Sequence, residues 1–204
     1  MGSDHYFTSS PRSDYATRTI RARLAGREVE LITAGGVFSP EHVDQGTQVL
    51  LATVPAPPLT GHLLDLGAGW GPIALSLALQ APDATVWAVD VNARALDLVR
   101  RNAQRLGITN VNAVLPDDVP AQVQFATIWS NPPIRVGKQE LHAMLAKWLP
   151  RLDTDADAWL VVAKHLGAES LQRWIGENLA LDVDRAANSK GFRVLRARLA
   201  ASAR

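Results

Sequence analysis

The chain has 204 residues, 47% of them hydrophobic, which is enough for one domain around a sizeable core. Its formal net charge of +1 excludes a protein that holds nucleic acid by overall charge, and the lack of cysteine excludes disulfides and thiolate chemistry. The five histidines show no ligand-like spacing, so we predict no metal site. No apolar run approaches the ~20 residues that cross a bilayer, and the N-terminus lacks the order of a signal peptide. We therefore expect a cytoplasmic protein with no membrane partner.

The first part of the chain is predicted to be an appendage to a larger core. Alternating apolar residues around a glycine turn predict a hairpin, and a helical pattern then runs up to a cluster of prolines. The expected elements are an extended arm at 1–17, strands at 18–24 and 29–33 and a helix at 44–54. We assign residues 1–54 to this arm, hairpin and leading helix, packed on the same domain as the core at 55–204.

Beyond residue 60, predicted strands alternate with predicted helices. The strands are expected at 62–67, 85–90, 111–115, 125–130 and 158–163, and the helices at 72–80, 93–106, 138–149 and 168–179. This alternation predicts βαβ units, and hence an α/β protein with a mostly parallel sheet and helices on both faces. Two final strands, at 181–187 and 193–199, are joined by so short a turn that they must run antiparallel.

A glycine-rich turn stands between the first core strand and its helix, within residues 63–72. Glycine lets the backbone turn sharply, and the following helix N-terminus attracts an anionic group, so the turn is typical of nucleotide binding. An NAD fingerprint requires glycine where Pro72 stands, which argues against an ordinary NAD site. The alternative is a glycine-rich connection without a ligand. The candidate cofactor contacts here are Asp65, Gly67, Ala68, Gly69 and Gly71.

Acidic residues follow the next two strands, at the edge of the sheet where doubly wound folds bind ligands. Asp90 is placed to accept hydrogen bonds from ribose hydroxyls, and Val91 beside it is a further candidate contact. The alternative is that Asp90 and Asn92 cap the next helix. Asp117 or Asp118 is placed to accept from an adenine amino group, unless both belong to a solvated turn.

The segment Asn131-Pro132-Pro133-Ile134 follows the fourth core strand. Two prolines remove two backbone donors and fix two φ angles, so we expect rigid carbonyls that are not used in a strand ladder. The Asn131 oxygen and the Pro132 carbonyl together would accept both hydrogens of an amino group, with Pro133 stiffening the turn. Asn131 is also a candidate cofactor contact. The alternative is an ordinary Asn-Pro turn.

These motifs, taken together, resemble the class I S-adenosylmethionine-dependent methyltransferases. More narrowly, the chain resembles the small-methyltransferase family, in particular the catalytic domain of bacterial 16S ribosomal RNA guanine-N2 methyltransferases. The further motifs that carry this likeness are His5-Tyr6-Phe7 and the segments 36–39, 44–47 and 189–194. The resemblance implies S-adenosylmethionine as cofactor and a Rossmann-like, seven-stranded sheet whose last strand is antiparallel. It also implies guanine N2 of ribosomal RNA, or the small ribosomal subunit, as acceptor and partner.

Two departures from the family leave the acceptor open. Relatives that act on the ribosome carry an extra N-terminal domain, and many have an aromatic residue where this chain has Ile134. Phe38 or Phe192 is the candidate to stack on a base instead, unless these rings belong to the core, and Lys190 is a candidate substrate contact.

The alternative acceptors are adenine N6 in a nucleic acid and glutamine N5 in a protein. An NAD-type oxidoreductase and a scaffold without catalysis are less favoured. The sequence does not fix the oligomeric state, and a monomer is compatible with it. The arginines and lysine expected to contact phosphates are Arg12, Arg18, Arg21, Arg23, Arg27, Arg185, Lys190, Arg193, Arg196, Arg198 and Arg204.

Overall fold

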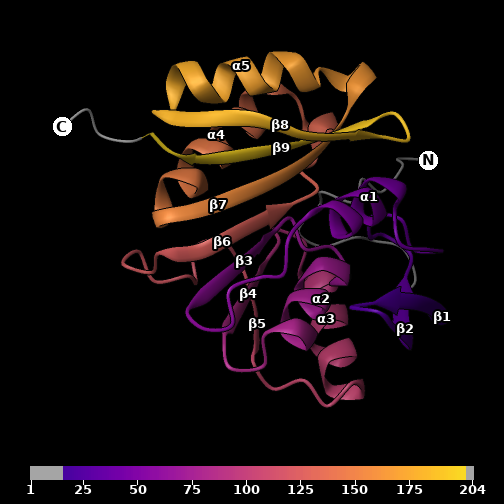
Figure 1. Cartoon of the computed structure of the whole chain (residues 1–204). Helices are drawn as coiled ribbons and strands as arrows, with labels where there is room; N and C mark the ends of the chain where they lie inside the picture. Colours follow the sequence, from indigo (N-terminus) through magenta and orange to yellow (C-terminus); the bar gives the residue numbers. More distant parts are fainter. Residues whose placement is uncertain (1–15, 201–204) are drawn as a thin grey trace.

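The computed structural model describes residues 16–200 and contains a seven-stranded sheet (Figure 1). Its strands are β3 (His62–Leu66), β4 (Thr85–Val89), β5 (Val111–Val114), β6 (Phe125–Ser130), β7 (Leu152–Ala163), β8 (Leu181–Ser189) and β9 (Phe192–Leu199). They are ordered β5-β4-β3-β6-β7-β9-β8. Strands β3 to β7 are parallel, and β9 runs antiparallel to both β7 and β8. This confirms the predicted mostly parallel sheet with an antiparallel last strand.

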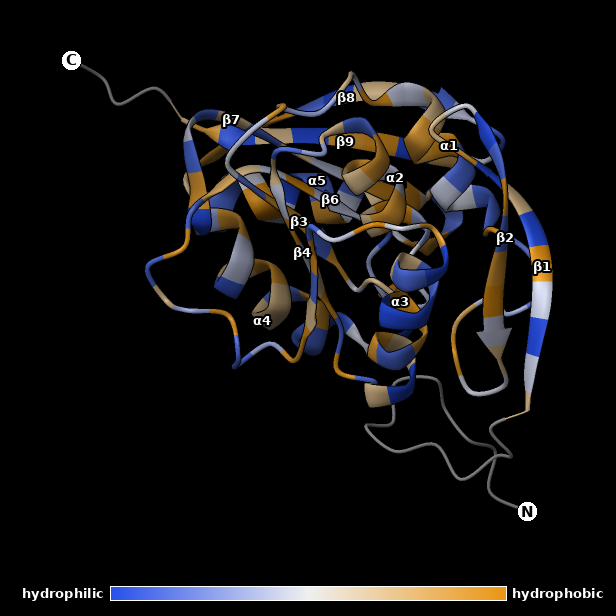
Figure 2. Ribbon diagram, turned by 90° about the horizontal axis from the view of Figure 1, so that it is seen from below, coloured by the Kyte–Doolittle hydropathy of each residue, from blue (hydrophilic) through white to orange (hydrophobic). Residues whose placement is uncertain are grey.

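Among the described residues, five α-helices cover the two faces of this sheet. They are α1 (Gln45–Thr53), α2 (Pro72–Gln80), α3 (Ala93–Arg105), α4 (Lys138–Trp148) and α5 (Ala168–Asn178). Side chains alternate along each strand, so Leu63 and Trp129 pack with α1, α2 and α3, whereas Leu64 and Ile128 pack with α4 and α5. Apolar residues follow the strands through the middle of the molecule, while the outer side of α3 is mostly hydrophilic (Figure 2).

Strand β7 is longer than the segment predicted at 158–163, because it already begins at Leu152. Aspartate is depleted in strands, so the acidic residues at its start hid this extension from sequence analysis. Asp157 is held within the strand by an ion pair with Arg196, whose Nε lies 2.7 Å from Oδ1. The added residues pair with β6 across a register shift between Phe125 and Thr127.

The predicted N-terminal hairpin is present as β1 (Thr17–Leu24) and β2 (Arg27–Ala34), a separate two-stranded sheet. Ala25 and Gly26 form its two-residue turn, both with positive φ, as tight hairpin turns require. The hairpin lies beside α2 and α3 (Figures 1 and 2). It buries a third apolar cluster against these helices, which includes Leu31 from β2 and Trp70 from the glycine turn.

A buried polar side chain also joins this hairpin to α3, in addition to the apolar contacts and the exposed ion pair between Arg105 and Glu30. Asn102 accepts from the backbone N–H of Ile32 at 2.6 Å and donates through Nδ2 to the Ile32 carbonyl at 2.9 Å. The same nitrogen reaches the Trp70 carbonyl at 3.2 Å. Asn102 is fully buried, and it therefore takes the place that a neighbouring strand would have beside β2.

We expect Asn102→Ala to lower the free energy of unfolding by about 1–3 kcal/mol, because it leaves buried backbone groups without hydrogen-bond partners. Urea denaturation followed by circular dichroism measures this change. Asn112→Ala, at an exposed position of β5, is the matched control and should alter stability by no more than about 0.5 kcal/mol. Equal effects of the two substitutions would contradict the role given to Asn102.

None of the helices in residues 16–200 is both long and apolar enough to span a membrane.

Candidate active site

A cleft of about 690 Å³ lies at the carboxyl ends of the parallel strands, within the range of small-molecule sites. Its lining follows the strand order across the sheet. The segments after β5 and β4 contribute Pro116 and Asp90, the turn after β3 contributes Gly67, and the segments after β6 and β7 contribute Asn131 and His165. The cleft is therefore built at the edge of the sheet that the sequence predicted.

The glycine turn is held against the next strand by its own backbone. The N–H groups of Gly67 and Ala68 both donate to the Val89 carbonyl, at 2.9 and 3.0 Å. Gly67 and Gly69 have positive φ, which favours glycine, and both line the cleft. A Cβ on Gly69 would meet no atom within 4 Å, so this position is open to a ligand.

Three of the predicted contacts shape the turn rather than line the cleft. Gly71 is the N-cap of α2 with φ 101°, and a Cβ there would lie 3.1 Å from Val99. Ala68 is buried. Asp65 is also fully buried, and its Oδ2 accepts from the N–H of Ala74 at 2.8 Å, which joins β3 to the first turn of α2. Asp65 therefore lies beneath the turn and not in the cleft, which corrects its prediction as a ligand contact.

The buried Asp65 carboxyl is expected to make folding stability depend on pH. Its Oδ1 has no hydrogen-bond partner within residues 16–200, and burial, opposed by the Ala74 N–H, raises its pKa to about 8. Because the folded-state pKa lies above that of the unfolded chain, the folded protein holds the proton more tightly. The free energy of unfolding should therefore fall between about pH 4 and pH 8, by at most about 1.4 kcal/mol per unit.

Asp65→Asn stays neutral and should flatten this dependence, so that the variant gains stability relative to the wild type as the pH rises. Urea denaturation of both proteins at about pH 5 and pH 8 measures the difference. A stability difference between the two proteins that is the same at both pH values would show that Asp65 does not titrate in this range.

Asp90 faces the cleft and holds the glycine turn at the same time. Its Oδ2 accepts from the N–H of Gly69 and its Oδ1 from the N–H of Asn92, both at 2.8 Å. Burial raises the pKa of Asp90, while these backbone hydrogen bonds oppose the rise. The cap of α3 is Asn92, whose side chain accepts from Arg94 and Ala95. Val91 is 47% exposed and lines the cleft beside Asp90.

The structure does not bring Asp117 and Asp118 to the cleft. The side chain of Asp117 is 93% exposed and pairs with Lys147, with Nζ 2.7 Å from Oδ1, and this contact lowers the pKa of Asp117. Pro116 takes the place at the cleft instead. Lys190 is likewise exposed outside the cleft, at the turn between β8 and β9. Sequence position after a strand did not reveal which way each side chain points.

The amide of Asn131 is fixed by two acceptors from the N-terminal part of the chain. Its Nδ2 donates to Asp44 Oδ2 at 2.9 Å and to Thr47 Oγ1 at 3.0 Å. Both amide hydrogens are therefore used, and Oδ1 remains to accept a hydrogen bond from a ligand. Asp44 also lines the cleft. The 44–47 segment contributes to the family resemblance, but nothing in the sequence predicts a role for Asp44 or Thr47.

The prolines after Asn131 form a tighter turn than we expected. The N–H of Ile134 donates to the Pro132 carbonyl at 2.8 Å, and Pro133 has φ −74° and ψ 75°, which together define an inverse γ-turn. The Pro132 carbonyl is thus not free of an internal partner, which corrects the expectation. A carbonyl oxygen has two lone pairs, so one remains for a ligand.

The three candidate substrate contacts at this end of the cleft are Phe38, Ile134 and Phe192, and all of them line it. Phe38 is 42% exposed, whereas Ile134 and Phe192 are half-buried and pack on the two main cores. His5-Tyr6-Phe7 and the arginines at 12 and 204 lie outside the described residues.

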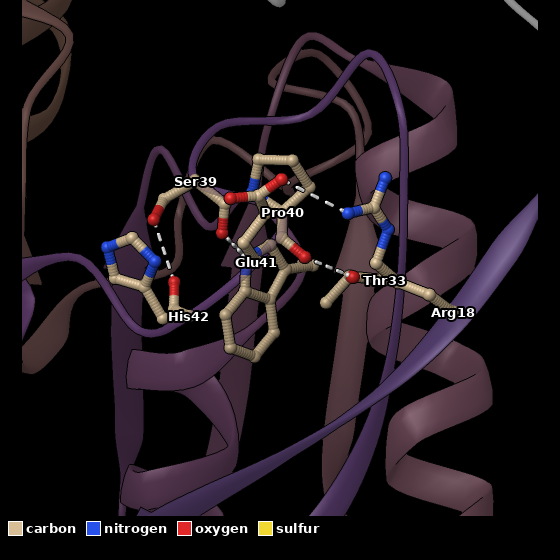
Figure 3. A network of polar contacts seen from close by, with 7 residues as sticks. Arg18, Thr33, Ser39, Pro40, Glu41 and His42 are labelled. Carbon is tan, nitrogen blue, oxygen red and sulfur yellow. Dashed lines mark hydrogen bonds and ion pairs between the residues drawn. The ribbon is translucent and has the colours of Figure 1, made fainter.

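The loop that carries Phe38 is held by a polar network beside the hairpin (Figure 3). Thr33 Oγ1 donates to the Pro40 carbonyl, and Ser39 Oγ donates to the His42 carbonyl at 2.7 Å. Arg18 pairs with Glu41, with the guanidinium Nη1 3.3 Å from the carboxylate Oε1. The indole N–H of Trp70 donates to the Ser39 carbonyl at 3.1 Å, so the loop is tied directly to the glycine turn.

The fold and this cleft are those of a Rossmann-like methyltransferase. The family model described as "Methyltransferase small domain" matches residues 28–196, and the chain belongs to this family. Membership confirms the prediction of an enzyme that uses S-adenosylmethionine as methyl donor.

Similar proteins extend the comparison in two directions. The Bacillus subtilis protein YbxB is 36% identical over 96% of this chain and 98% of its own length. Ribosomal RNA small subunit methyltransferase C of Aeromonas hydrophila is 37% identical over 61% of this chain, but the match spans only 36% of that protein. The T. thermophilus 16S rRNA N2 G1207 methyltransferase, solved with AdoMet and guanosine, shares the fold with a TM-score of 0.76. It is 23% identical, with coverage of 93% of this chain and 52% of that one.

Proposed function

We propose that this chain transfers a methyl group from S-adenosylmethionine to guanine N2 in small-subunit ribosomal RNA. The observation that carries the proposal is the Asn131 amide, which is held with its oxygen available beside the glycine turn of a methyltransferase cleft. The choice of guanine follows from the relatives whose names describe a small-subunit ribosomal RNA methyltransferase. This chain spans about a third of the length of the first of these relatives.

The residues of the cleft fit the cofactor. The open surface at Gly69 leaves room for it, and the Asp90 carboxylate lies beside this surface, where it would accept from ribose hydroxyls. Val91 and Pro116 supply apolar surface for the adenine ring. The bound cofactor supplies a methyl group on a sulfonium, which is already strongly electrophilic.

The chain itself then has to align an amino nitrogen with that methyl group. Asn131 Oδ1 and the second lone pair of the Pro132 carbonyl accept the two hydrogens of the amino group, which fixes the direction of the nitrogen lone pair. Both acceptors also stabilise the positive charge that develops on the nitrogen. The proton leaves to solvent during or after transfer, so no strongly basic side chain is required.

Acceptor contacts are proposed for the surface around Asn131. Phe38 is the exposed aromatic ring at this end of the cleft, and we assign it to stack on the target base, with Ile134 and Phe192 closing the site. A base within an A-form helix cannot reach the cleft, so the target guanine must be unpaired or flipped out.

Basic side chains near this end would hold the RNA backbone. The N–H of Lys164 donates to the Gly191 carbonyl at 2.9 Å, which brings exposed Lys164 and Lys190 to the same side of the molecule. By contrast, Arg196 and Arg198 both pair with Asp157. We therefore assign the phosphate contacts to the two lysines, and each lost contact should make binding less dependent on salt.

The decisive experiment incubates the protein and radiolabelled S-adenosylmethionine with small ribosomal subunits, naked ribosomal RNA, DNA and a release factor in parallel. Each product is digested and the labelled residue is identified. Label in N2-methylguanosine is the expected result, and Asn131→Ala serves as the inactive control.

Label found only in N6-methyladenine or in methylglutamine would reject guanine while keeping an amino-group methyltransferase. A wild-type protein that binds S-adenosylmethionine but labels none of these substrates would favour a cofactor-binding scaffold instead.

A further inference from the structure

The start of α1 and the end of β6 meet at the Asn131 amide. One carboxylate oxygen, Asp44 Oδ2, accepts from Asn131 Nδ2 at 2.9 Å and also from the backbone N–H groups of Gly46 and Thr47, at 2.8 and 3.3 Å. Asp44 is thus the N-cap of α1 and a partner of Asn131 at once. The buried Thr47 adds its Oγ1 at 3.0 Å.

This arrangement determines which atom of the amide faces the cleft. An asparagine side chain has two N–H donors on one atom and an acceptor on the other, and rotation about its last bond exchanges them. Because two acceptors hold the nitrogen, the reversed orientation would set Oδ1 against a carboxylate and a hydroxyl oxygen. The carboxylate also makes a charge-assisted hydrogen bond, which polarises the amide and makes Oδ1 a better acceptor.

The packing at Gly46 leaves no spare room around this junction. A Cβ on Gly46 would lie 2.9 Å from Asp44 Oδ2 and 2.9 Å from the ring of Phe192. Real Cβ atoms do not approach this closely, so a side chain here would displace the carboxylate or the ring. Gly46 therefore lets Asp44 and Phe192 sit side by side at the cleft, which both of them line.

We propose that Asp44 and Thr47 are positioning residues, which fix the Asn131 amide so that only its oxygen can meet the acceptor amino group. The inference rests on the proposed role of Asn131. It adds that the start of α1 sets the orientation of the Asn131 amide, on which the reaction depends. The expected consequence is that these side chains affect kcat without contacting the cofactor.

Three substitutions separate this role from a structural one. Thr47→Val keeps the shape of the side chain but leaves one amide hydrogen without an acceptor, and Thr47→Ser restores the acceptor. Asp44→Ser keeps a good N-cap residue but is too short to reach Asn131. We expect Thr47→Val and Asp44→Ser to lower kcat by about 10-fold to 100-fold. The KM for the acceptor and the Kd for S-adenosylmethionine should stay within about twofold, and Thr47→Ser should recover most of kcat.

Thr53→Val is the matched control, because it makes the same change at the far end of α1, where Thr53 Oγ1 donates to the Val49 carbonyl. It should leave kcat unchanged. A second measurement needs no turnover. The side-chain NH2 signals of Asn131, identified by their loss in Asn131→Ala, should exchange slowly with solvent in the wild type and faster in Thr47→Val.

The outcomes are distinct. Wild-type kcat in Thr47→Val, or a rise in KM or Kd with kcat unchanged, would overturn the positioning role. If the wild-type protein labels no acceptor, the proposed function fails, and the NH2 exchange alone then decides whether α1 holds the amide. Asp44→Ser provides the same comparison if Thr47→Val does not fold.

Discussion

Asn131→Ala is expected to lower the rate of methyl transfer by about 10²–10³-fold, which corresponds to about 2.7–4 kcal/mol of transition-state stabilisation. The substitution removes the acceptor that orients the amino nitrogen, and it leaves the Asp44 carboxylate and the Thr47 hydroxyl without their shared donor. Single-turnover kinetics at saturating S-adenosylmethionine measures the chemical step. The Kd for the cofactor should change little, because Gly67, Gly69 and Asp90 are untouched.

Asn110→Ala is a suitable control for this effect. Asn110 is also a hydrogen-bonded asparagine, and its Nδ2 donates to the carbonyls of Ala81 and Ala84, away from the cleft. Its loss should reduce thermal stability while the folded enzyme keeps its turnover rate. Transfer at the wild-type rate by Asn131→Ala would show that another group orients the amino acceptor.

The second large effect is expected for Asp90→Ala, which should weaken S-adenosylmethionine binding by about 10-fold to 100-fold. Two losses combine in this variant. The ribose hydroxyls lose their proposed acceptor, and the N–H groups of Gly69 and Asn92 lose the carboxylate that holds the turn in shape. Isothermal titration calorimetry with S-adenosylhomocysteine gives the affinity without turnover.

Asp90→Asn is not expected to restore binding, because its amide nitrogen would face one of the two N–H donors. Asp118→Ala tests the other predicted carboxylate. Since Asp118 is exposed and does not line the cleft, its loss should leave the affinity unchanged. A weaker affinity in Asp118→Ala would mean that the segment after Pro116 closes over the bound adenine.

The sequence predicted the sheet because its signals are local. Apolar runs bounded by turn residues marked β3, β4 and β6, and the short turn before β9 required an antiparallel final pair. The glycine turn and Asn131 could be found for the same reason, since each follows a strand directly. The start of β7 was missed because its aspartates oppose the local strand signal, which pairing with β6 and an arginine on β9 overrides.

The partners of Asn131 could not be derived in this way. Asp44 and Asn131 are 87 positions apart, and no periodicity relates them. The Asp44-Gln45-Gly46-Thr47 segment reads locally as a helix start, which it is. Only the packing of α1 against the sheet brings that helix start to the end of β6. Likewise, the ion pair that Asp117 makes with Lys147, outside the cleft, depends on the position of α4.

The attachment of the hairpin through Asn102 makes the glycine turn sensitive to a segment outside the sheet. Within the described residues, β1 and β2 pair with no other strand, so opening them as one unit would leave the register of β3 to β9 unchanged. Opening would uncover Trp70, which is 2% exposed and belongs to the glycine turn. A ligand that needs the turn in its closed shape must then slow hydrogen exchange in the hairpin. Ligand binding in the cleft and opening of the hairpin are thermodynamically linked, so a bound ligand should stabilise the hairpin although the hairpin lies outside the sheet.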